Sequence, residues 1–339
     1  MKKLMFPLVF SLALSGFTAY SVLSTLVFEH NNGIKTSDDE DKNINFISKI
    51  DIEENNPINN NEENPITPIE EKKPFDGEVL YSYKDESVSF DIYKENIKTK
   101  HMSKDRLMDT IVYYVDVRVI DLSHMRARFA KNGQFGLNIE DKTSNIAREA
   151  NAKLAISGDN YGKQEGGYVL RNGIKYRSDR HSDNKEDLVI WGDGSFQIIK
   201  EKEISLDSIK AIVDDNDPSA AWQIYCFGPA LVVDSQIHVK EDDEVSVFST
   251  LGNQRCSIGI FEPFHYLFAI CDGRLKDSYG MSLYEMASFM KNKGAKIAYN
   301  LDGGGSATLW YDGKVLNRPN TNGERDLGER KISDIIYIR

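Results

Sequence analysis

Apolar and polar residues alternate with a period of two in many short runs along the chain, as β-strands require. The run from Ile111 to Ile120 is β-branched and aromatic throughout, and its second half alternates. Similar runs occupy positions 154–157, 168–171, 188–191, 196–199, 230–233, 257–260 and 266–271. Asn172-Gly173 follows one of these runs and predicts a hairpin turn. The pattern therefore predicts a domain built mainly from strands.

A helical period replaces this alternation between Ser282 and Lys293, where leucine, methionine, alanine and phenylalanine recur at helical spacing. Ser282 is predicted to cap the helix, Glu285 to complete a capping box, and Gly294 to end it. This gives Glu285 a structural role, which we favour over a catalytic one. The helix leads into an apolar run that ends at Leu301.

A second, shorter helix is predicted from Asn145 to Asn151, with Thr143 or Ser144 as its cap. It leads into the run at 154–157. Helices and strands are thus mixed within one part of the chain. We predict an α+β fold, a single large, mixed and strand-rich domain behind an N-terminal anchor and a tether.

The N-terminus has the composition of a membrane segment. Lys2 and Lys3 are followed by no charged residue from Leu4 to Phe28, which is long enough for a helix to cross a bilayer. The lysines before the run and Glu29 after it orient the N-terminus to the cytoplasm. We therefore predict that residues 1–29 form a transmembrane anchor, with the domain on the extracellular side. The alternative is a cleaved signal peptide and a secreted protein.

Residues 30–74 are rich in asparagine, aspartate, glutamate and proline, with almost no aromatic residues. Such a segment buries too little apolar surface to offset its ordering entropy, so we predict a disordered linker. The remaining residues, 75–339, are long enough for one domain with a substantial core. The net charge of −11 argues against a nucleic acid partner. An anionic substrate would need local basic residues.

The stretch from Asp302 to Ser306, here called the glycine bend, reads Asp-Gly-Gly-Gly-Ser between two β-rich runs. Three consecutive glycines weaken regular structure, so a function at this turn must need them. Their backbone N–H groups, from Gly303, Gly304 and Gly305, can form an anion-binding nest. The alternative is a hairpin turn that is merely rich in glycine. Polar residues on both flanks, such as Asn300, favour a site.

A second polar loop follows the run at 154–157 and reads Gly158-Asp159-Asn160-Tyr161-Gly162. Loops at strand ends are common places for functional residues. A plain turn also uses glycine, aspartate and asparagine, so this loop alone does not decide between the two. The three cysteines, Cys226, Cys256 and Cys271, lie in or beside apolar runs and are interpreted as buried, inert thiols. One disulfide is the alternative.

Four motifs resemble those of the phosphodiester glycosidase family and occur in that family's order. They are Phe227-Gly228-Pro229-Ala230-Leu231-Val232, Arg255-Cys256-Ser257-Ile258-Gly259, Asp272-Gly273-Arg274 with Gly280-Met281-Ser282-Leu283, and Asn300-Leu301-Asp302-Gly303-Gly304-Gly305-Ser306. The resemblance spans roughly Ile111 to Ile338. One loop departs from the pattern, because many relatives have Asn-Gly-Gly-aromatic where this chain reads Gly158-Asp159-Asn160-Tyr161. The chain looks like a member of the family's Gram-positive branch.

The resemblance implies hydrolysis of a sugar linked through its anomeric carbon to a phosphodiester, with a phosphomonoester as leaving group. The oxocarbenium-like transition state needs a carboxylate as nucleophile or base. Asp302 is the first candidate, Asp159 the second and Asp272 the third. For Asp272 a turn acid in Asp-Gly is an equal alternative.

Arg255 and Arg274 flank a predicted hairpin and are expected to converge on one phosphate through forked hydrogen bonds. The alternative is a pair of surface arginines bound to carboxylates. Asn160, Asn300 and Ser306 are expected to bind sugar hydroxyls or phosphate oxygens.

Metal ligands are not evident in the sequence. The histidines at positions 101, 124, 181, 238 and 265 show no metal spacing. Asp214-Asp215-Asn216-Asp217 has the composition of a calcium loop, but such a run is more often a solvated turn. We therefore expect no cofactor and leave a divalent cation such as calcium as the alternative.

Three functions compete for these residues. The first is an extracytoplasmic hydrolase of phosphorylated cell-surface or exopolysaccharide glycans, anchored to the membrane. The second is a non-catalytic module that binds such glycans. The third is an enzyme of polymer assembly, which would transfer the sugar to an acceptor.

Overall fold

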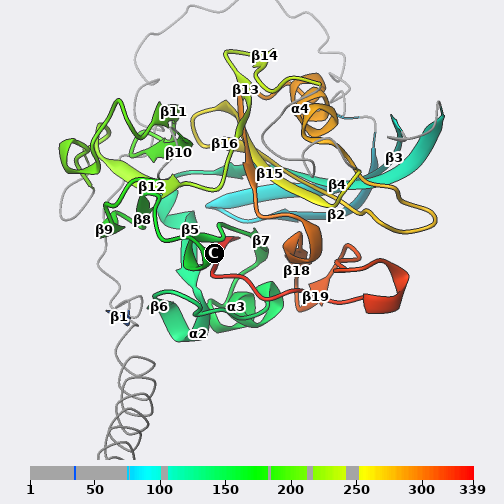
Figure 1. Cartoon of the computed structure of the whole chain (residues 1–339), viewed down its shortest axis with the longest axis horizontal. Coiled ribbons are helices and arrows are strands. Elements are labelled where there is room, and N and C mark those ends of the chain that lie inside the picture. The colour runs from blue at the N-terminus through cyan, green and yellow to red at the C-terminus, as the bar shows by residue number, and fades with distance from the viewer. Residues whose placement is uncertain are drawn as a thin grey trace, which may run out of the picture.

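Three antiparallel sheets dominate the computed structural model, which describes residues 34–35, 75, 77–100, 106–181, 185–211, 217–241 and 252–339 (Figure 1). The predicted anchor and nearly all of the predicted linker lie outside these residues. The linker's strand β1, Ile34–Lys35, pairs with β6, Gln134–Phe135. Within the described ranges no helix has the length and apolar character needed to cross a bilayer.

The largest sheet has eight strands in the order β14-β13-β17-β15-β16-β4-β3-β2. In that order the strands span Gln236–Ile237, Ala230–Val233, Ile297–Leu301, Arg255–Glu262, His265–Cys271, Leu107–Val119, Val88–Lys100 and Glu78–Lys84. The predicted hairpin is confirmed as β15 and β16, with Arg255 directly opposite Cys271. The strands β2 and β3, at the edge of this sheet, were not predicted from the sequence.

Two five-stranded sheets complete the domain. One has the order β19-β18-β7-β20-β5, and its strands span Lys314–Val315, Leu309–Tyr311, Leu154–Ser157, Asp334–Ile338 and Met125–Phe129. The other has the order β11-β10-β12-β8-β9, spanning Phe196–Lys200, Glu186–Trp191, Ala221–Tyr225, Val169–Arg171 and Ile174–Arg177. The predicted hairpin turn at Asn172-Gly173 joins β8 to β9 with positive φ at both residues.

Helices are few and short in the described part of the chain. The α-helices are α2, Ala130–Gly133, α3, Thr143–Glu149, and α4, Leu283–Asn292. Single turns of 3-10 helix occupy Leu122–His124, Tyr161–Lys163, Leu206–Ser208, Gly304–Ser306 and Glu324–Asp326. This strand-rich mixture agrees with the predicted α+β class.

The caps of the two main helices turned out differently. Ser282 and Glu285 form the predicted capping box of α4. The predicted cap of α3 is wrong, because that helix already begins at Thr143 and its N-cap residue, Lys142, makes no side-chain cap bond. The reason is tertiary: the hydroxyl of Ser144 donates to Glu329 Oε2 at 2.5 Å, and its backbone N–H donates to Oε1 at 2.8 Å.

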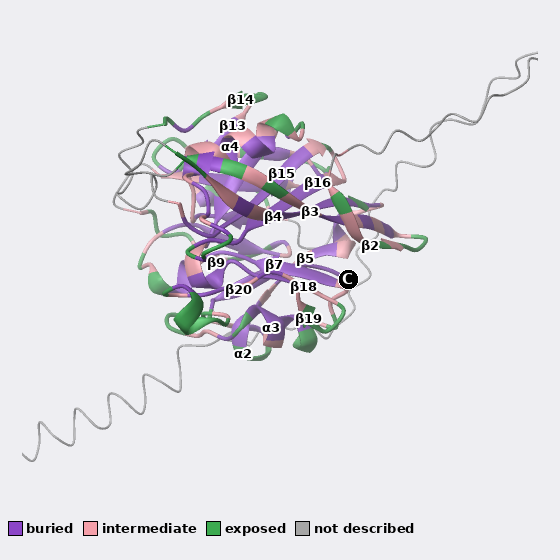
Figure 2. Cartoon of the chain, turned by 90° about the vertical axis from the view of Figure 1, so that its right-hand side faces the viewer, coloured by how far each residue is buried: buried purple, intermediate pink, exposed green. Residues whose placement is uncertain are grey.

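The sheets and helices form layers, with α4 on one side of the eight-stranded sheet and α3 beneath the sheet that contains β7 and β20 (Figure 1). Apolar residues of all three sheets meet in one core, which explains why β7 and β20 are buried along their length (Figure 2). Met286 and Met290 of α4 are fully buried, each contributing about 1.5–3 kcal/mol to stability.

The cysteines behave as predicted. All three are free thiols and completely buried. Burial raises the pKa of Cys256 and of Cys271 to about 12, so neither is a thiolate near neutral pH. The alternative of a disulfide is therefore not realised.

Candidate active site

The glycine bend connects two sheets. It leaves β17 of the eight-stranded sheet and enters β18 of a five-stranded sheet, so the two runs that flank it do not pair as a hairpin. The backbone N–H of Asp302 donates to the carbonyl oxygen of Gly158 at 3.1 Å. The two polar loops singled out in the sequence therefore meet at the ends of β17 and β7.

Close packing explains why three glycines occur here. A Cβ on Gly303 would lie 2.7 Å from the carbonyl oxygen of Gln254, and one on Gly305 would lie 2.8 Å from Thr321 Oγ1. Gly304 has a φ of +59°, a conformation that costs other residues strain. The bend thus passes between neighbouring segments at distances that side chains forbid.

One of the three amides of the predicted nest is used within the protein. The N–H of Gly304 donates to the carbonyl oxygen of Gln254 at 3.0 Å. The N–H groups of Gly303 and Gly305 remain the predicted anion donors, and side chains must supply the rest of the attraction for an anion.

Two guanidinium groups, from Arg274 and Arg330, flank the bend. A Cβ built on Gly304 would lie 3.7 Å from Arg274 Nη2 and 3.8 Å from Arg330 Nη1. Arg274 donates to neutral atoms, Asn253 Oδ1 at 2.9 Å and the carbonyl oxygen of Thr321 at 2.5 Å. Partial burial lowers the pKa of Arg274, and the like charge of Arg330 adds to this effect. Positive charge is therefore concentrated beside the half-buried residues Gly303 and Gly304.

Arg255 lies deeper than Arg274. Its side chain is almost covered, with the residue 9 % exposed, and Nε donates to the carbonyl oxygen of Met281 at 2.9 Å. Burial, assisted by the charge of Arg274, lowers the pKa of Arg255 to about 10. The predicted convergence of Arg255 and Arg274 on one phosphate stays a prediction, and Arg274 and Arg330 are the more exposed pair.

Asp302 is the carboxylate that adjoins this positive charge. It is 4 % exposed, and its two oxygens lie 3.1 and 3.2 Å from Arg330 Nη2. Burial raises the pKa of Asp302 above its ordinary value, while Arg330 and a hydrogen bond with Ser306 oppose that shift. Ser306 Oγ also accepts from Arg330 Nε at 3.0 Å. A buried carboxylate held by one partly exposed cation is suited to act as nucleophile or base.

Asp159 lies in a buried ionic network. Its Oδ2 accepts from the N–H of Cys226 at 2.7 Å and from Arg171 Nη2 at 3.4 Å. Arg171 Nε also donates to Asp334 Oδ2 at 2.6 Å, and the N–H of Asp159 donates to Asp334 Oδ1 at 2.7 Å. Burial, reinforced by Asp159, raises the pKa of Asp334 to about 6. Asp159 therefore connects the ends of β12, β8 and β20 through Cys226, Arg171 and Asp334. Its Oδ1 has no hydrogen-bond partner among the described residues.

Asp272 has both oxygens occupied. Oδ1 accepts from the backbone N–H of Arg318 at 2.7 Å, and Oδ2 accepts from its Nε at 2.9 Å. Arg318 also binds Asp277 through Nη1. Asp272 ends β16, which β15 separates from β17. This geometry favours the turn-acid interpretation.

The two predicted amide side chains differ in exposure. Asn300 is buried on the same side of β17 as Asp302 and donates through Nδ2 to the carbonyl oxygen of Gly228 at 2.8 Å. Its Oδ1 has no partner within the described residues. Asn160 is half-buried beside Asp159 and caps the turn at Tyr161–Lys163 through its backbone carbonyl.

Sequence reasoning missed Arg330, Arg171, Asp334 and Arg318. Arg330 lies in a charged run, Glu-Arg-Lys, that reads as solvated surface. Its role depends on a contact with Asp302 across 28 residues, which no local pattern reveals. Asp334 begins a strand and has no motif of its own.

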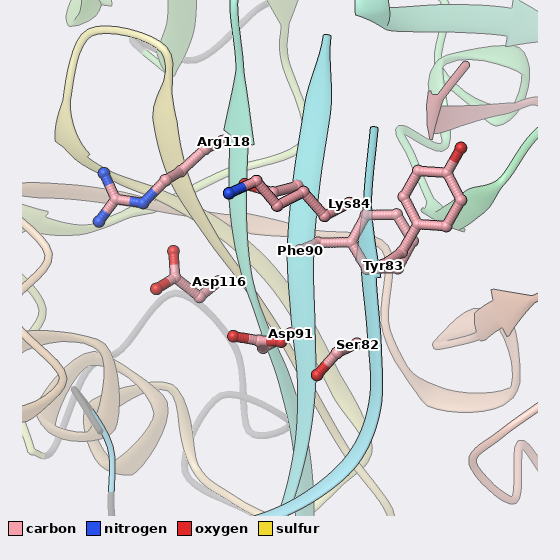
Figure 3. Close-up of a pocket in the computed structure, with 8 residues that line it drawn as sticks. Ser82, Tyr83, Lys84, Phe90, Asp91, Asp116 and Arg118 are labelled. Atoms are coloured by element: carbon pink, nitrogen blue, oxygen red, sulfur yellow. The ribbon is translucent and has the colours of Figure 1, made fainter. Parts of the chain in front are cut away.

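A pocket of about 430 Å³ lies elsewhere, on strands β2, β3 and β4 (Figure 3). Its lining consists of Ser82, Tyr83, Lys84, Ser89, Phe90, Asp91, Asp116 and Arg118. None of these residues was a candidate from the sequence. Asp116 Oδ1 already lies 2.5 Å from His265 Nε2. The candidate active site is therefore the glycine bend and the side chains around it.

Comparison with known proteins decides the family. A profile described as phosphodiester glycosidase matches residues 150–339, more than half of the chain. The chain belongs to the phosphodiester glycosidase family. The matched region of the chain contains Asp159, Asp302 and Arg330, so the whole candidate site lies inside it.

Two curated proteins and one solved structure are similar to this chain. The SPbeta prophage-derived uncharacterized protein YomE of Bacillus subtilis (strain 168) is 23% identical over 270 residues, covering 77% of this chain and 38% of that protein. N-acetylglucosamine-1-phosphodiester alpha-N-acetylglucosaminidase of Mus musculus is 28% identical over 101 residues, covering 29% of this chain and 19% of that protein. The chain thus matches well under half of the length of either relative.

The structural comparison concerns the fold. The zebrafish N-acetylglucosamine-1-phosphodiester alpha-N-acetylglucosaminidase catalytic domain, auto-inhibited by its pro-peptide, superposes with a TM-score of 0.58 at 19% identity. The match covers 78% of this chain and 87% of that domain. The two share an architecture, and the roles of individual residues in this chain must be argued from its own geometry.

Proposed function

We propose that this protein is an extracytoplasmic hydrolase that cleaves the anomeric C–O bond of a sugar linked to a phosphodiester. The observation that carries the proposal is the position of Asp302 beside the guanidinium group of Arg330, in a bend that Arg274 also flanks. A carboxylate and a pair of cations suited to bind phosphate thus lie beside the glycine bend, where Gly303 and Gly304 are half-buried. Family membership supports the same class of chemistry.

The chemistry follows from the leaving group. A phosphomonoester has a second pKa near 6, so it departs as an anion and needs little help from a protein acid. What it needs is positive charge where negative charge develops, which Arg274 and Arg330 supply. Asp302 then acts in one of two ways: as the nucleophile that attacks the oxocarbenium-like carbon, or as the base that activates an attacking water. In either case its negative charge stabilises the positive charge on that carbon. The buried network around Asp159 holds the neighbouring strand end in place.

The substrate we propose is a phosphorylated glycan of the cell surface or an exopolysaccharide. The uncharged run from Leu4 to Phe28 and the polar linker after it support this location, because they would hold the domain outside the membrane. The net charge of −11 supports binding of an anionic substrate by local arginines and not by bulk charge.

The test uses a panel of synthetic α- and β-linked sugar 1-phosphodiesters. We expect the full-length protein to release free sugar and a phosphomonoester from at least one of them, and Asp302→Asn to abolish release while folding normally. Binding without release by the wild-type protein would identify a non-catalytic glycan-binding module instead. Transfer of the sugar to an added acceptor, without free sugar, would identify an enzyme of polymer assembly.

A further inference from the structure

A second cluster of ionisable side chains lies in the sheet that contains β10 and β11, outside the candidate active site. It consists of His181, Asp187 and Glu201, each of which offers one potential ligand atom, and these atoms all lie within 4.8 Å of one another. Asp187 and Glu201 are completely buried, and the His181 side chain is 8 % exposed. Burying several ionised carboxylates together lowers the stability of the fold unless a proton or a cation neutralises their charge.

The local fold builds the cluster from three segments. Asp187 of β10 pairs with Ile199 of β11, and Glu201 follows two residues later, so both carboxylates lie on the same side of the sheet. His181 comes from the segment after β9. Its backbone N–H donates to Glu201 Oε2 at 2.5 Å, and its Nδ1 lies 2.6 Å from Oε1.

Asp187 is the unexplained member of this cluster. Neither of its oxygens has a hydrogen-bond donor among the described residues, although the side chain is completely buried. Burial raises the pKa of Asp187, and the neighbouring Glu201 raises it further. Two adjacent buried carboxylates require either a shared proton or a cation.

The other ring nitrogen of His181 has a partner of its own. Nε2 lies 2.5 Å from Gln164 Oε1, an amide oxygen that also accepts from Lys185 Nζ at 3.5 Å. With the proton on Nε2, the ring donates to Gln164, as a ligating histidine usually donates to a nearby oxygen, and the lone pair of Nδ1 faces Glu201 Oε1. Two acceptors this close need a proton or a cation between them. Gly167 has a φ of +100°, and a Cβ there would clash with His181 Cε1, so the ring packs against the backbone.

We propose that His181 Nδ1, Asp187 and Glu201 bind one divalent transition-metal ion, while His181 Nε2 donates to Gln164 Oε1. The mixture of one imidazole nitrogen with carboxylate oxygens suits Zn²⁺ or Mn²⁺ better than Ca²⁺. The potential ligand atoms all lie within 4.8 Å of one another, and binding at about 2.0–2.2 Å would draw the Asp187 carboxylate toward the other two. No metal spacing is visible in the sequence because the ligands come from separate segments.

The ion would act on structure and not on the reaction. Gln164 follows Asp159 by five residues, and the turn Tyr161–Lys163 connects them. Through His181, which donates to Gln164, the cation would therefore hold the segment that leaves the Asp159 loop against β10 and β11. This proposal is independent of the hydrolase proposal, since its test does not measure activity.

The test is metal binding by the full-length protein after treatment with EDTA. We expect one equivalent of Zn²⁺ or Mn²⁺ by mass spectrometry, absorption bands of nitrogen and oxygen ligation with Co²⁺, and a rise in Tm of about 5 °C at saturating metal. Asp187→Asn should weaken binding at least about tenfold. Asp179→Asn, an exposed acid on the same segment as His181, is the matched control and should bind like wild type.

Two results would overturn the proposal. One is a wild-type protein that retains no metal and shows no change in Tm with any of the three ions, as a proton shared by Asp187 and Glu201 would predict. The other is equal metal binding by Asp187→Asn and wild type. If Asp187→Asn fails to fold, nitrogen hyperfine coupling in the Mn²⁺-loaded wild-type protein decides: coupling supports ligation by His181, and its absence refutes it.

Discussion

Two Asp-Gly pairs, Asp272-Gly273 and Asp302-Gly303, end strands of the same sheet, yet their carboxylates are bound differently. Asp272 has one donor for each oxygen, the backbone N–H and Nε of Arg318 at 2.7 and 2.9 Å. Asp302 shares a single nitrogen of Arg330 between its oxygens at 3.1 and 3.2 Å. The same dipeptide thus forms two kinds of ion pair. We call the pair at Asp272 closed, because each oxygen has its own donor, and the pair at Asp302 open, because both oxygens share one nitrogen.

The difference shows how a carboxylate becomes available for chemistry. The pair at Asp272 satisfies its charge within the protein, which stabilises the turn and leaves little capacity for a ligand. The pair at Asp302 faces glycines and a partly exposed guanidinium, since the Arg330 side chain is 45 % exposed. Arg318 is also bound to Asp277, whereas Arg330 lies beside the glycine bend.

The largest effect that separates the two pairs is expected from Asp302→Asn. Loss of a carboxylate that acts as nucleophile or base should lower kcat by about 10²- to 10⁴-fold. Asp272→Asn should leave kcat of the folded protein close to wild type. The check is steady-state kinetics on a sugar 1-phosphodiester, with circular dichroism to confirm folding. Equal losses in both variants would contradict the distinction.

The next largest effect concerns Arg274. Its replacement by methionine removes a charged donor from the phosphate site without changing the strain of a positive φ, since both residues carry a Cβ. Loss of a charge-assisted hydrogen bond of about 1.5–3 kcal/mol should raise KM about 10- to 150-fold. Arg318→Met is the matched control and should leave KM unchanged. Inhibition by inorganic phosphate should weaken in parallel with KM for Arg274→Met.

A smaller effect, on stability, is expected at the closed pair. Asp272→Asn leaves one donor of Arg318 opposite an amide N–H₂ group, which should lower the free energy of unfolding by about 1–3 kcal/mol. Asp302→Asn should cost less, because one nitrogen of Arg330 faces Asp302 whereas two donors of Arg318 face Asp272. Urea unfolding of both variants gives the comparison. A greater loss for Asp302→Asn would show that the pair at Asp302 is the structural one.

The smallest effect is on the pH profile. Because burial raises the pKa of Asp302, the acidic limb of kcat/KM should lie above the ordinary aspartate value of 3.8. Arg330 opposes that shift, so Arg330→Gln should move the limb to higher pH, by about one unit. Arg318→Met should leave the limb in place. If the acidic limb has the same pKa in Arg330→Gln as in wild type, Asp302 is not the group that titrates.

Most of the fold was predictable where the signal is local. The hairpin Ser257 to Cys271 and the helix after Ser282 depend on apolar periodicity and a capping box, and both are confirmed. The strand β2 was missed because it lies at a sheet edge, where exposed polar residues obscure the alternation. The strand β3 was missed although it pairs on both sides, since only its first half alternates and its second half is polar. The cap of α3 was misplaced because Glu329, distant in sequence, binds Ser144.

The site was predictable only in part. The sequence placed Asp302, Asp159 and Arg274 in polar or glycine-rich loops, and the structure brings the bend together with the Asp159 loop and Arg274. It could not identify Arg330 or Arg171, since their importance arises from contacts with distant carboxylates. It also predicted a free amide at Gly304, which the fold uses for a hydrogen bond to Gln254.

The central claim, that the bond broken is the anomeric C–O bond, is tested most directly by hydrolysis of a sugar 1-phosphodiester in H₂¹⁸O. If Asp302 directs attack at carbon while Arg274 and Arg330 hold the departing phosphate, the label appears in the free sugar and not in the phosphomonoester. Label in the phosphomonoester would mean attack at phosphorus and would contradict the account.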